Sequence, residues 1–247
     1  MLQVRDLTLR YPNGKLALAR FNIAVSAGEL VIVLGGNGSG KTTLLRCVTR
    51  TLMPTEGEVR VNGTDLAPLR GERLRRARLE LALISQHASL VRRRSVLANV
   101  AAGALGRLGG VWTALGGLPK AELAAAHGHL TEVGLAHLAR QRAGTLSGGQ
   151  AQRVAIARAL AQHPRVLLAD EPVASLDPEA AEEIMRLLRR LAVEENLAVL
   201  CVLHQVELAY KYADRLVGIR DGGMAFDLPR AELSRETVRR LYLSEAA

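Results

Sequence analysis

Aromatic residues and cysteines are scarce in this chain. Phe, Trp and Tyr make up 3% of the 247 residues although 49% are hydrophobic, so Leu, Val, Ile and Ala must build the core. The two cysteines, Cys47 and Cys201, lie in apolar segments and form no C-x-x-C pair. This spacing predicts small buried side chains in a reducing compartment and argues against a cysteine-based zinc site.

Long hydrophobic runs are also missing. A helix that spans a bilayer needs about 20 consecutive apolar residues, and the nearest candidate, residues 95–118, is interrupted by Arg107 and several glycines. The first ten residues alternate between polar and apolar and lack the apolar segment of a signal peptide. We therefore expect a soluble cytoplasmic chain that forms one large domain, or one domain with a helical insertion.

Charge is abundant but biased toward one sign. The formal net charge is +9, which would suit a surface that faces nucleic acid, anionic lipid headgroups or an acidic protein. The arginine pairs at 75–76, 189–190 and 239–240 are scattered rather than massed together. We interpret most of this charge as an ordinary solvated surface.

The hydrophobic pattern of the first fifty residues predicts strands that lead into a helix. Residues 2–9 alternate with a period of two, as in a half-exposed strand. A turn at 11–14 precedes a second strand that begins in 19–25. Residues 30–34 form a continuous apolar run, which is typical of a strand buried on both faces, and 42–51 form the helix that follows.

The pattern changes between residues 86 and 160, where Ala- and Leu-rich helical periodicity replaces the strands. Beyond this segment we expect strands at 165–169, 197–203 and 216–219, and a helix at 178–192. Buried strands that alternate with helices predict a largely parallel sheet covered on both faces. The helical segment is then an insertion into one α/β core.

A glycine-rich loop follows the buried strand at 30–34. It matches G-x-x-x-x-G-K-[ST] over Gly35, Gly36, Asn37, Gly38, Ser39, Gly40, Lys41 and Thr42. Backbone N–H groups of such a loop can point inward at phosphates, because no bulky side chain prevents the approach, and the helix N-terminus adds positive potential. Lys41 supplies a cation for the β- and γ-phosphates and the Thr42 hydroxyl a ligand for Mg²⁺. With Thr43, the loop predicts a site for a nucleoside triphosphate.

Two adjacent carboxylates end the strand predicted at 165–169. Asp170 and Glu171 therefore lie at the carboxyl edge of the sheet, where ligands of open α/β sheets bind. Neighbouring strand residues point in opposite directions, so we expect the two acids to serve different tasks. Asp170 suits the coordination shell of Mg²⁺, and Glu171 suits the general base that polarises the attacking water.

A capping serine and two glycines open another helix, in the pentapeptide Leu146-Ser147-Gly148-Gly149-Gln150. This helix start is a second potential anion site. The pentapeptide resembles the signature of the ATP-binding-cassette (ABC) ATPases, and with the glycine loop the resemblance extends over nearly the whole chain. It implies an α/β P-loop NTPase fold with a RecA-like parallel-sheet core, an N-terminal antiparallel β subdomain and an all-helical signature subdomain.

The resemblance also implies a division of the chain. Residues 1–247 form a single ABC ATPase domain. About 1–85 and 162–247 make the catalytic core with its β subdomain, and about 86–161 make the helical signature subdomain.

The same resemblance implies roles for residues whose types alone say little. Gln86 stands where the family has the Q-loop glutamine, which touches Mg²⁺ or water and reports to the membrane partner. Asp177 stands in the D-loop that links two copies and contributes to the nucleotide site. His204 resembles the switch histidine that contacts the γ-phosphate and steadies Glu171. Tyr11 resembles the aromatic residue that stacks on adenine.

Two variant motifs are similar to those of phosphonate-import ATPases within the family. The acids stand in Asp-Glu-Pro-Val-Ala-Ser-Leu-Asp at 170–177, and the switch histidine stands in Leu-His-Gln at 203–205. The Gly- and Trp-containing stretch 103–120 is also similar. Two departures touch no catalytic role: Ala151, where that family usually has Gln, and Leu228-Pro229, in place of Gly-Pro after the final strand.

The resemblance further implies partners and a mechanism. Two copies would clamp two Mg-ATP head to tail, each between the glycine loop of one chain and Ser147, Gly148, Gly149 and Gln150 of the other. Their opening and closing would move a membrane permease docked near Gln86. A separate periplasmic binding protein would select the substrate, and nucleic acid would play no part. The subunit would lie peripherally at the cytoplasmic face of the inner membrane.

Two alternatives stay open on the sequence alone. One is an ABC importer ATPase for another small substrate such as amino acids. The other is a soluble ABC ATPase that acts on ribosomes or DNA, for which the charge of +9 would bind phosphates. A single cassette without a sustained heptad run disfavours that second alternative.

Overall fold

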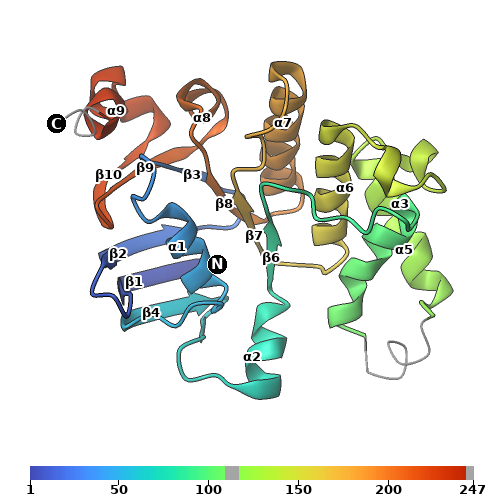
Figure 1. The fold of residues 1–247 in the computed structure, drawn as a ribbon, viewed down its shortest axis with the longest axis horizontal. Helices are drawn as coiled ribbons and strands as arrows, with labels where there is room; N and C mark the ends of the chain where they lie inside the picture. The colour runs from blue at the N-terminus through green and yellow to red at the C-terminus, as the bar shows by residue number, and fades with distance from the viewer. Residues whose placement is uncertain (109–116, 243–247) are drawn as a thin grey trace.

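The computed structural model describes residues 1–108 and 117–242, and it contains two β-sheets that stand side by side (Figure 1). The smaller sheet is antiparallel, with the strand order β2-β1-β4-β5. Its strands are β1 (Leu2–Arg10), β2 (Leu16–Val25), β4 (Glu56–Val61) and β5 (Thr64–Asp65). Buried and exposed residues largely alternate along β1, because one face of this sheet packs on the core.

The larger sheet has the strand order β10-β9-β3-β8-β7-β6. Neighbouring strands from β9 to β6 pair in parallel, and β10 pairs antiparallel with β9. The bounds are β3 (Leu30–Leu34), β6 (Leu81–Ile84), β7 (Val166–Asp170), β8 (Ala198–Val202), β9 (Arg215–Arg220) and β10 (Gly223–Pro229). All residues of β3 and β8 are buried, as expected for strands covered on both faces. The predicted parallel sheet is confirmed.

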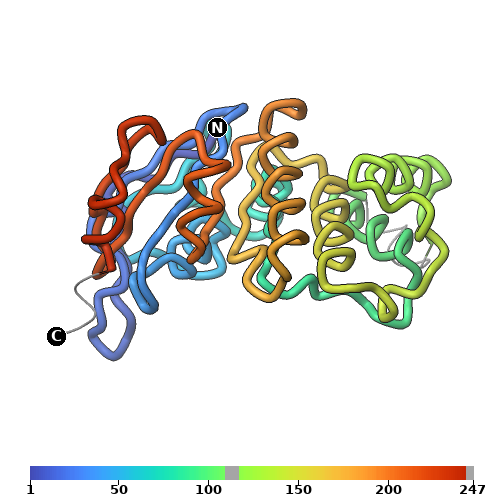
Figure 2. The backbone as a smooth tube through the Cα atoms, turned by 90° about the horizontal axis from the view of Figure 1, so that it is seen from above, coloured from blue at the N-terminus to red at the C-terminus, as the bar shows by residue number. Residues whose placement is uncertain are grey.

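Helices pack around and beside this sheet (Figures 1 and 2). The helices α3, α5 and α6 gather at one end of the molecule, and the smaller sheet and the end of the described chain lie at the other, with α7 between them. The α-helices are α1 (Lys41–Val48), α2 (Gly71–Arg78), α3 (Val96–Ala101), α5 (Lys120–Glu132), α6 (Gly148–Leu160), α7 (Pro178–Glu194), α8 (Val206–Tyr212) and α9 (Arg235–Tyr242). The 3₁₀ segments are Ala102–Gly106, Ala136–Leu138, Ala143–Thr145 and Arg230–Glu232.

The two faces of β3 contribute to two separate hydrophobic clusters. Ile32 belongs to the cluster that includes Ile156 of α6 and Leu188 of α7. Val33, on the opposite face, belongs with Leu44 of α1 and with the buried face of the smaller sheet. Burying a side chain of this size contributes roughly 1.5–3 kcal/mol. Packing on both faces therefore holds the end of β3, where the glycine loop begins, between α1 and α7.

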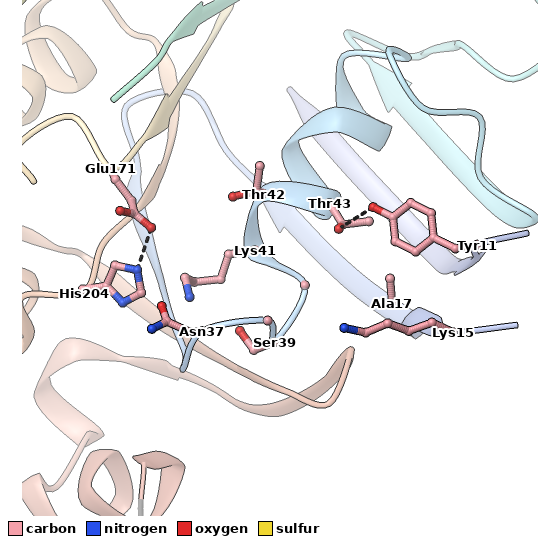
Figure 3. A pocket seen from close by; sticks show the side chains of 12 residues that line it. Tyr11, Lys15, Ala17, Asn37, Ser39, Lys41, Thr42, Thr43, Glu171 and His204 are labelled. Atoms are coloured by element: carbon pink, nitrogen blue, oxygen red, sulfur yellow. Dashed lines mark hydrogen bonds and ion pairs between the residues drawn. The ribbon is translucent and has the colours of Figure 1, made fainter. Parts of the chain in front are cut away.

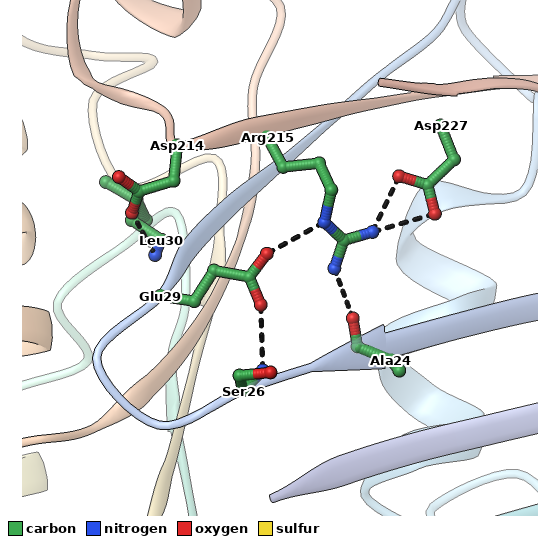
Figure 4. A network of polar contacts seen from close by, with 7 residues as sticks. All are labelled: Ala24, Ser26, Glu29, Leu30, Asp214, Arg215 and Asp227. Atoms are coloured by element: carbon green, nitrogen blue, oxygen red, sulfur yellow. Dashed lines mark hydrogen bonds and ion pairs between the residues drawn. The ribbon is translucent and has the colours of Figure 1, made fainter. Parts of the chain in front are cut away.

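A polar network joins the two sheets at the start of β9 (Figure 4). Arg215 Nε donates to Glu29 at 2.7 Å, and Nη1 donates to both carboxylate oxygens of Asp227 at 2.6 and 2.7 Å. Its Nη2 donates to the backbone oxygen of Ala24 in β2. The side chains of Arg215 and Glu29 are each only 19% exposed. Removing one partner would leave a poorly solvated charge, so the network resists separation of the sheets.

The predicted elements are present, with shifted boundaries. Strand β2 begins at Leu16, three residues before the predicted range. Helix α1 ends at Val48 rather than at 51, because Arg50 takes a left-handed backbone with φ of 58°. Leu228 and Pro229 lie within β10 rather than after the final strand, which corrects the sequence analysis. Proline is tolerated there because β10 is an edge strand and Pro229 is its last residue.

Several elements carry no clear signal in the sequence. Helix α2 has the sequence GERLRRAR, in which Leu74 and Ala77 are the only apolar side chains, so the sequence gives no clear apolar periodicity. Between residues 86 and 160 the described part of the chain contains helices and one isolated bridge, Ser95 to Arg142, in agreement with the predicted loss of strands. Residues 109–116 of the stretch 103–120 lie outside the described residues. Of the described helices, none combines the length and apolar character needed to cross a bilayer.

Candidate active site

The glycine loop connects β3 to α1, and its surroundings leave no room for side chains at two positions. A Cβ on Gly35 would lie 2.3 Å from the carbonyl oxygen of Ile219 in β9. A Cβ on Gly40 would lie 2.5 Å from the carbonyl oxygen of Ala17 in β2. Gly40 also has a φ of 112°, which residues with a side chain rarely adopt. The loop therefore depends on glycine at both positions to approach the two sheets.

Two polar side chains of the loop are buried. Lys41 is 5% exposed, and its Nζ donates to the carbonyl oxygens of Gly35 and Gly36, both at 2.7 Å. Ser39 is 7% exposed, and its Oγ has no hydrogen-bond partner within residues 1–108 and 117–242. A buried hydroxyl without a partner is unfavourable by about 1–3 kcal/mol. These groups fit a loop that receives the oxygens of a ligand.

A cavity of about 280 Å³ opens beside the loop (Figure 3). Glu171 and His204 lie on one side of it and Tyr11 and Thr43 on the other, with Lys41 between them. The Tyr11 hydroxyl lies 3.2 Å from Thr43 Oγ1. The lining residues are Tyr11, Lys15, Ala17, Asn37, Gly38, Ser39, Gly40, Lys41, Thr42, Thr43, Glu171 and His204. Residues far apart in the sequence thus meet around one space.

The two adjacent acids have different partners. Asp170 ends β7 and accepts a hydrogen bond from Thr42 Oγ1 at 3.4 Å. Glu171 Oε1 lies 2.6 Å from His204 Nε2, and Glu171 has a left-handed backbone with φ of 51°. The strand has ended before Glu171, so strand alternation, on which the sequence argument relied, does not set its direction. The backbone turn at Glu171 aims its carboxylate at the cavity.

Burial raises the pKa of Asp170 above its ordinary value, and the charge of Glu171 raises it further. The hydrogen bond from Thr42 opposes this increase. A nearby cation would stabilise the ionised form of Asp170, which burial disfavours. Asp170 and Thr42 therefore fit Mg²⁺, which usually binds one or two carboxylates and completes its shell with water and phosphate oxygens. No group of three or more His, Cys, Asp and Glu that could hold a metal occurs in the described residues. A cation at Asp170 would take its remaining ligands from oxygens outside this set, such as the Thr42 hydroxyl, water or a phosphate.

The signature residues do not line this cavity. Ser147 Oγ accepts from the backbone N–H of Gln150 at 3.3 Å, and Gln150 Oε1 accepts from the Ser147 N–H at 3.0 Å. This reciprocal capping box starts α6. Gly149 packs on α7, where a Cβ would lie 3.0 Å from Ala180 Cβ, and Gly148 is exposed. Helix α6 lies beyond α7 as seen from α1 (Figure 1).

Gln86 and Asp177 also lie outside the cavity lining. Gln86 is exposed in the loop after β6, next to the carboxyl end of β7. Asp177 is the N-cap of α7, and its Oδ1 accepts from the Ala180 N–H at 2.9 Å. The roles of both residues stay predictions.

The family described as ABC transporter matches residues 18–174 of this chain. This chain belongs to the ABC transporter family. A protein of Frankia casuarinae named phosphonates import ATP-binding protein PhnC is 51% identical over 221 residues, which cover 90% of this chain and 87% of the relative. A protein of Halalkalibacterium halodurans named phosphonates import ATP-binding protein PhnC 3 is 41% identical over 242 residues, covering 98% and 94% of the two chains.

Solved structures of ABC cassettes share the fold. CbiO1 of Clostridium perfringens, part of the ABC transporter complex cbiONQ, has a TM-score of 0.85 and 29% identity, covering 98% of this chain and 94% of that one. The cassette MJ0796, described as a dimer in a post-hydrolysis state with ADP and Pi, has a TM-score of 0.80 and 30% identity, covering 93% and 99%. The predicted ABC-type α/β fold is confirmed.

In this ABC cassette the cavity contains two residues that the sequence analysis did not name, Lys15 and Ala17. Lys15 directly precedes β2, four residues after Tyr11. Its positive charge close to the predicted adenine-stacking residue could have indicated that it lines the nucleotide site. Ala17 contributes backbone contact with Gly40, for which its residue type carries no signal.

Proposed function

We propose that this chain is the ATP-hydrolysing subunit of an ABC importer for phosphonates or related phosphorus oxyanions. One observation carries the enzymatic part of this proposal. The glycine loop, Thr42, Glu171 and His204 line one cavity, and Asp170 lies behind Thr42, from which it accepts a hydrogen bond. The signature at the start of α6 lies beyond α7. Each chain therefore offers two separate half-sites.

The cavity beside the loop binds the triphosphate of ATP. The backbone N–H groups of residues 35–40 and the start of α1 surround the phosphates. Lys41 Nζ exchanges its two carbonyl partners for β- and γ-phosphate oxygens. Tyr11 stacks on the adenine, and Thr43, held at its hydroxyl, completes this side of the site. Thr42, Asp170 and Gln86 would hold Mg²⁺, which offsets the negative charge of the phosphates when bound.

Glu171 is the general base of hydrolysis. Its carboxylate takes a proton from the water that attacks the γ-phosphorus, which is the step that a carboxylate at the mouth of this cavity can perform. His204 lies 2.6 Å from Glu171 Oε1, so it orients the carboxylate and can also reach a γ-phosphate oxygen. The left-handed backbone at Glu171 holds the pair in place.

Two copies of the chain complete the two sites. Ser147, Gly148, Gly149 and Gln150 of one copy close over the nucleotide of the other, because a glycine-flanked helix start offers N–H donors to an anion. Asp177 lies at the N-terminus of α7, against which this signature packs, and would link the copies. The dimeric state described for MJ0796 supports such a pairing.

The conformational change that accompanies hydrolysis is coupled to a membrane permease, which docks near Gln86 and the helical segment. We propose the division stated above, with about 86–161 as the helical signature subdomain and the remaining residues as the catalytic core. The chain would then sit peripherally at the cytoplasmic face of the inner membrane, and a periplasmic binding protein would select the substrate. The names of its relatives and the motifs at 170–177 and 203–205 support phosphonate as that substrate.

Reconstitution with its permease and binding protein in proteoliposomes tests the proposed function. We expect methylphosphonate to stimulate ATP hydrolysis, and glutamine, as a matched small substrate of another class, to leave it at the basal rate. Stimulation by glutamine instead would favour an amino-acid importer. Activity of the isolated chain should rise more steeply than its concentration, because hydrolysis requires the dimer. A specific activity that is unchanged by dilution would contradict the shared site.

A further inference from the structure

The loop that carries Gln86 is attached to the signature helix by two side chains. We call residues 85–89 the Gln86 loop. Gln152 of α6 is 3% exposed, and its Nε2 donates to the Ser85 carbonyl at 3.1 Å. Arg158, two turns further along α6, donates from Nη2 to the Ala88 carbonyl at 2.8 Å and from Nη1 to the Ser89 carbonyl at 2.9 Å. The helix thus holds both ends of the Gln86 loop.

The Gln86 loop also has a defined internal shape. The hydroxyls of Ser85 and Ser89 both donate to the His87 carbonyl, at 2.7 and 3.2 Å. Ser89 has a left-handed backbone with φ of 47°. Together with the bonds from α6, four of the five carbonyls of the Gln86 loop accept hydrogen bonds, so its shape is fixed by both its own hydroxyls and the helix.

The attachment is partly buried: the bonds to Ser85 and Ala88 are partly shielded from water, and the bond to Ser89 is exposed. Burial lowers the pKa of Arg158, because the charged guanidinium loses hydration there. Its two hydrogen bonds to carbonyls replace that hydration. Hydrogen bonds in which a donor is charged are about twice as strong as neutral ones. Pulling the Gln86 loop away from α6 would break three hydrogen bonds and leave the buried amide of Gln152 without an acceptor, so the contacts favour movement of the two parts as one unit.

We propose that Gln152 and Arg158 are positioning residues that make the Gln86 loop move with α6. This inference rests on the proposed function, in which the start of α6 engages the nucleotide of the second copy and the permease docks near Gln86. A displacement of α6 on dimer closure then carries the Gln86 loop with it. One helix serves both contacts: Ser147, its N-cap, faces the nucleotide, and Gln152 and Arg158, further along α6, hold the loop.

The variants Gln152→Met and Arg158→Lys test this attachment. Methionine keeps the length of glutamine but donates no hydrogen bond, and lysine keeps the charge but loses the planar fork that reaches two carbonyls. Gln162→Met is the matched control. Gln162 follows α6 and donates from Nε2 to the carbonyls of Arg78, Leu79 and Leu81, so it makes similar contacts at the other end of β6 without touching the Gln86 loop.

The measurement uses spin-label distances in the slowly hydrolysing parent Glu171→Gln. Labels are placed on cysteines introduced at exposed positions by Thr64→Cys in β5, His87→Cys in the Gln86 loop and Ala124→Cys in α5, which packs on α6. The native Cys47 and Cys201 are buried and stay unlabelled. Distances 64–87 and 64–124 are recorded before and after Mg-ATP, with size-exclusion chromatography to follow dimer formation.

In the parent and in the Gln162→Met control we expect both distances to change with Mg-ATP. In the double variant Gln152→Met/Arg158→Lys the 64–124 distance should still change, while the 64–87 change should be lost. With Glu171 intact, kcat of the reconstituted complex should fall about two- to tenfold at an unchanged KM for ATP, as expected for one or two weakened hydrogen bonds.

Two results would overturn the inference. One is a 64–87 change in the double variant equal to that of the parent, and the other is a parent dimer in which neither distance changes. A parent that forms no dimer with Mg-ATP would instead overturn the proposed function, and the inference with it. A raised KM for ATP, or an equal loss of kcat in Gln162→Met, would indicate a general structural role.

Discussion

The variant Glu171→Gln separates proton transfer from every other role of this residue. Glutamine has the volume of glutamate, so it fits the partly buried position, which is 20% exposed at the side chain. Its amide can still form a hydrogen bond to His204, which lies 2.6 Å from Glu171 Oε1. The left-handed backbone is equally available to glutamine. The substitution therefore removes the base and keeps the shape.

The expected loss follows from the chemistry of the site. A positioned general base contributes about 10²–10⁴-fold to a rate, which corresponds to about 2.7–5.4 kcal/mol of the activation barrier at 1.36 kcal/mol per tenfold. ATP binding should persist. The charge of Glu171 raises the pKa of Asp170, so its removal makes Asp170 easier to ionise and favours the cation that accompanies ATP. We expect slow turnover together with a long-lived dimer.

Single-turnover hydrolysis of radiolabelled ATP measures the chemical step, and size-exclusion chromatography with Mg-ATP measures the dimer. Glu171→Asp is the control that keeps the charge but withdraws the carboxylate by one methylene, and it should retain part of the rate. Turnover of Glu171→Gln within a factor of about three of the parent would refute the assignment of the base, since general-base catalysis contributes at least about 10²-fold. Loss of ATP binding would place Glu171 among the binding residues instead.

Three further predictions concern the rest of the site. Ser147→Arg should keep the ATP affinity of the monomer. It should lower the rate of hydrolysis by roughly 10²-fold or more, which is the effect of removing a donor to the transition state. Weaker ATP binding by the monomer in a fluorescence titration would mean that the signature acts within its own chain. Gly40→Ala should abolish ATP binding, because the new Cβ would meet the Ala17 carbonyl at 2.5 Å and φ is 112°; an unchanged affinity would contradict the tight loop geometry. Folding raises the pKa of Asp170. The folded chain therefore binds more protons than the unfolded chain from pH 3.8 up to the raised value, and this group lowers the free energy of unfolding as pH rises through that window. Asp170→Asn should remove that decline in the free energy of unfolding and stabilise the nucleotide-free chain at pH 7, while abolishing Mg²⁺-dependent hydrolysis. Urea unfolding at several pH values checks the effect on stability. A variant less stable than the parent would contradict the raised pKa of Asp170.

The sequence predicted the core of the fold because its signals are local. The apolar run of β3, the glycine loop and α1 follow one another directly, so backbone geometry alone places phosphate-binding N–H groups at the end of a buried strand. Helix α2 shows the limit of such signals. Five of its eight residues are Arg or Glu and none is buried, and only Ala77 packs, partly buried, against a hydrophobic cluster, which is too little to give a periodic apolar signal.

The direction of Glu171 shows a second limit. Strand alternation correctly separates neighbours inside β7, but the strand ends at Asp170, and a left-handed residue then turns the chain. That turn precedes Pro172, before which an extended backbone is the usual preference. The local rule therefore does not hold at this position, as is common at functional sites.

What the sequence determined by itself was chemistry carried by neighbouring residues: the phosphate loop, the paired acids and the capped signature helix. Tertiary structure decided which of these meet. It brought His204 to Glu171 across 33 positions, added Lys15 to the cavity, placed the signature beyond α7, and attached the Gln86 loop to α6 through Gln152 and Arg158. Spacing along a chain is set by backbone geometry, whereas contacts between distant residues depend on which faces of the sheets and helices pack together.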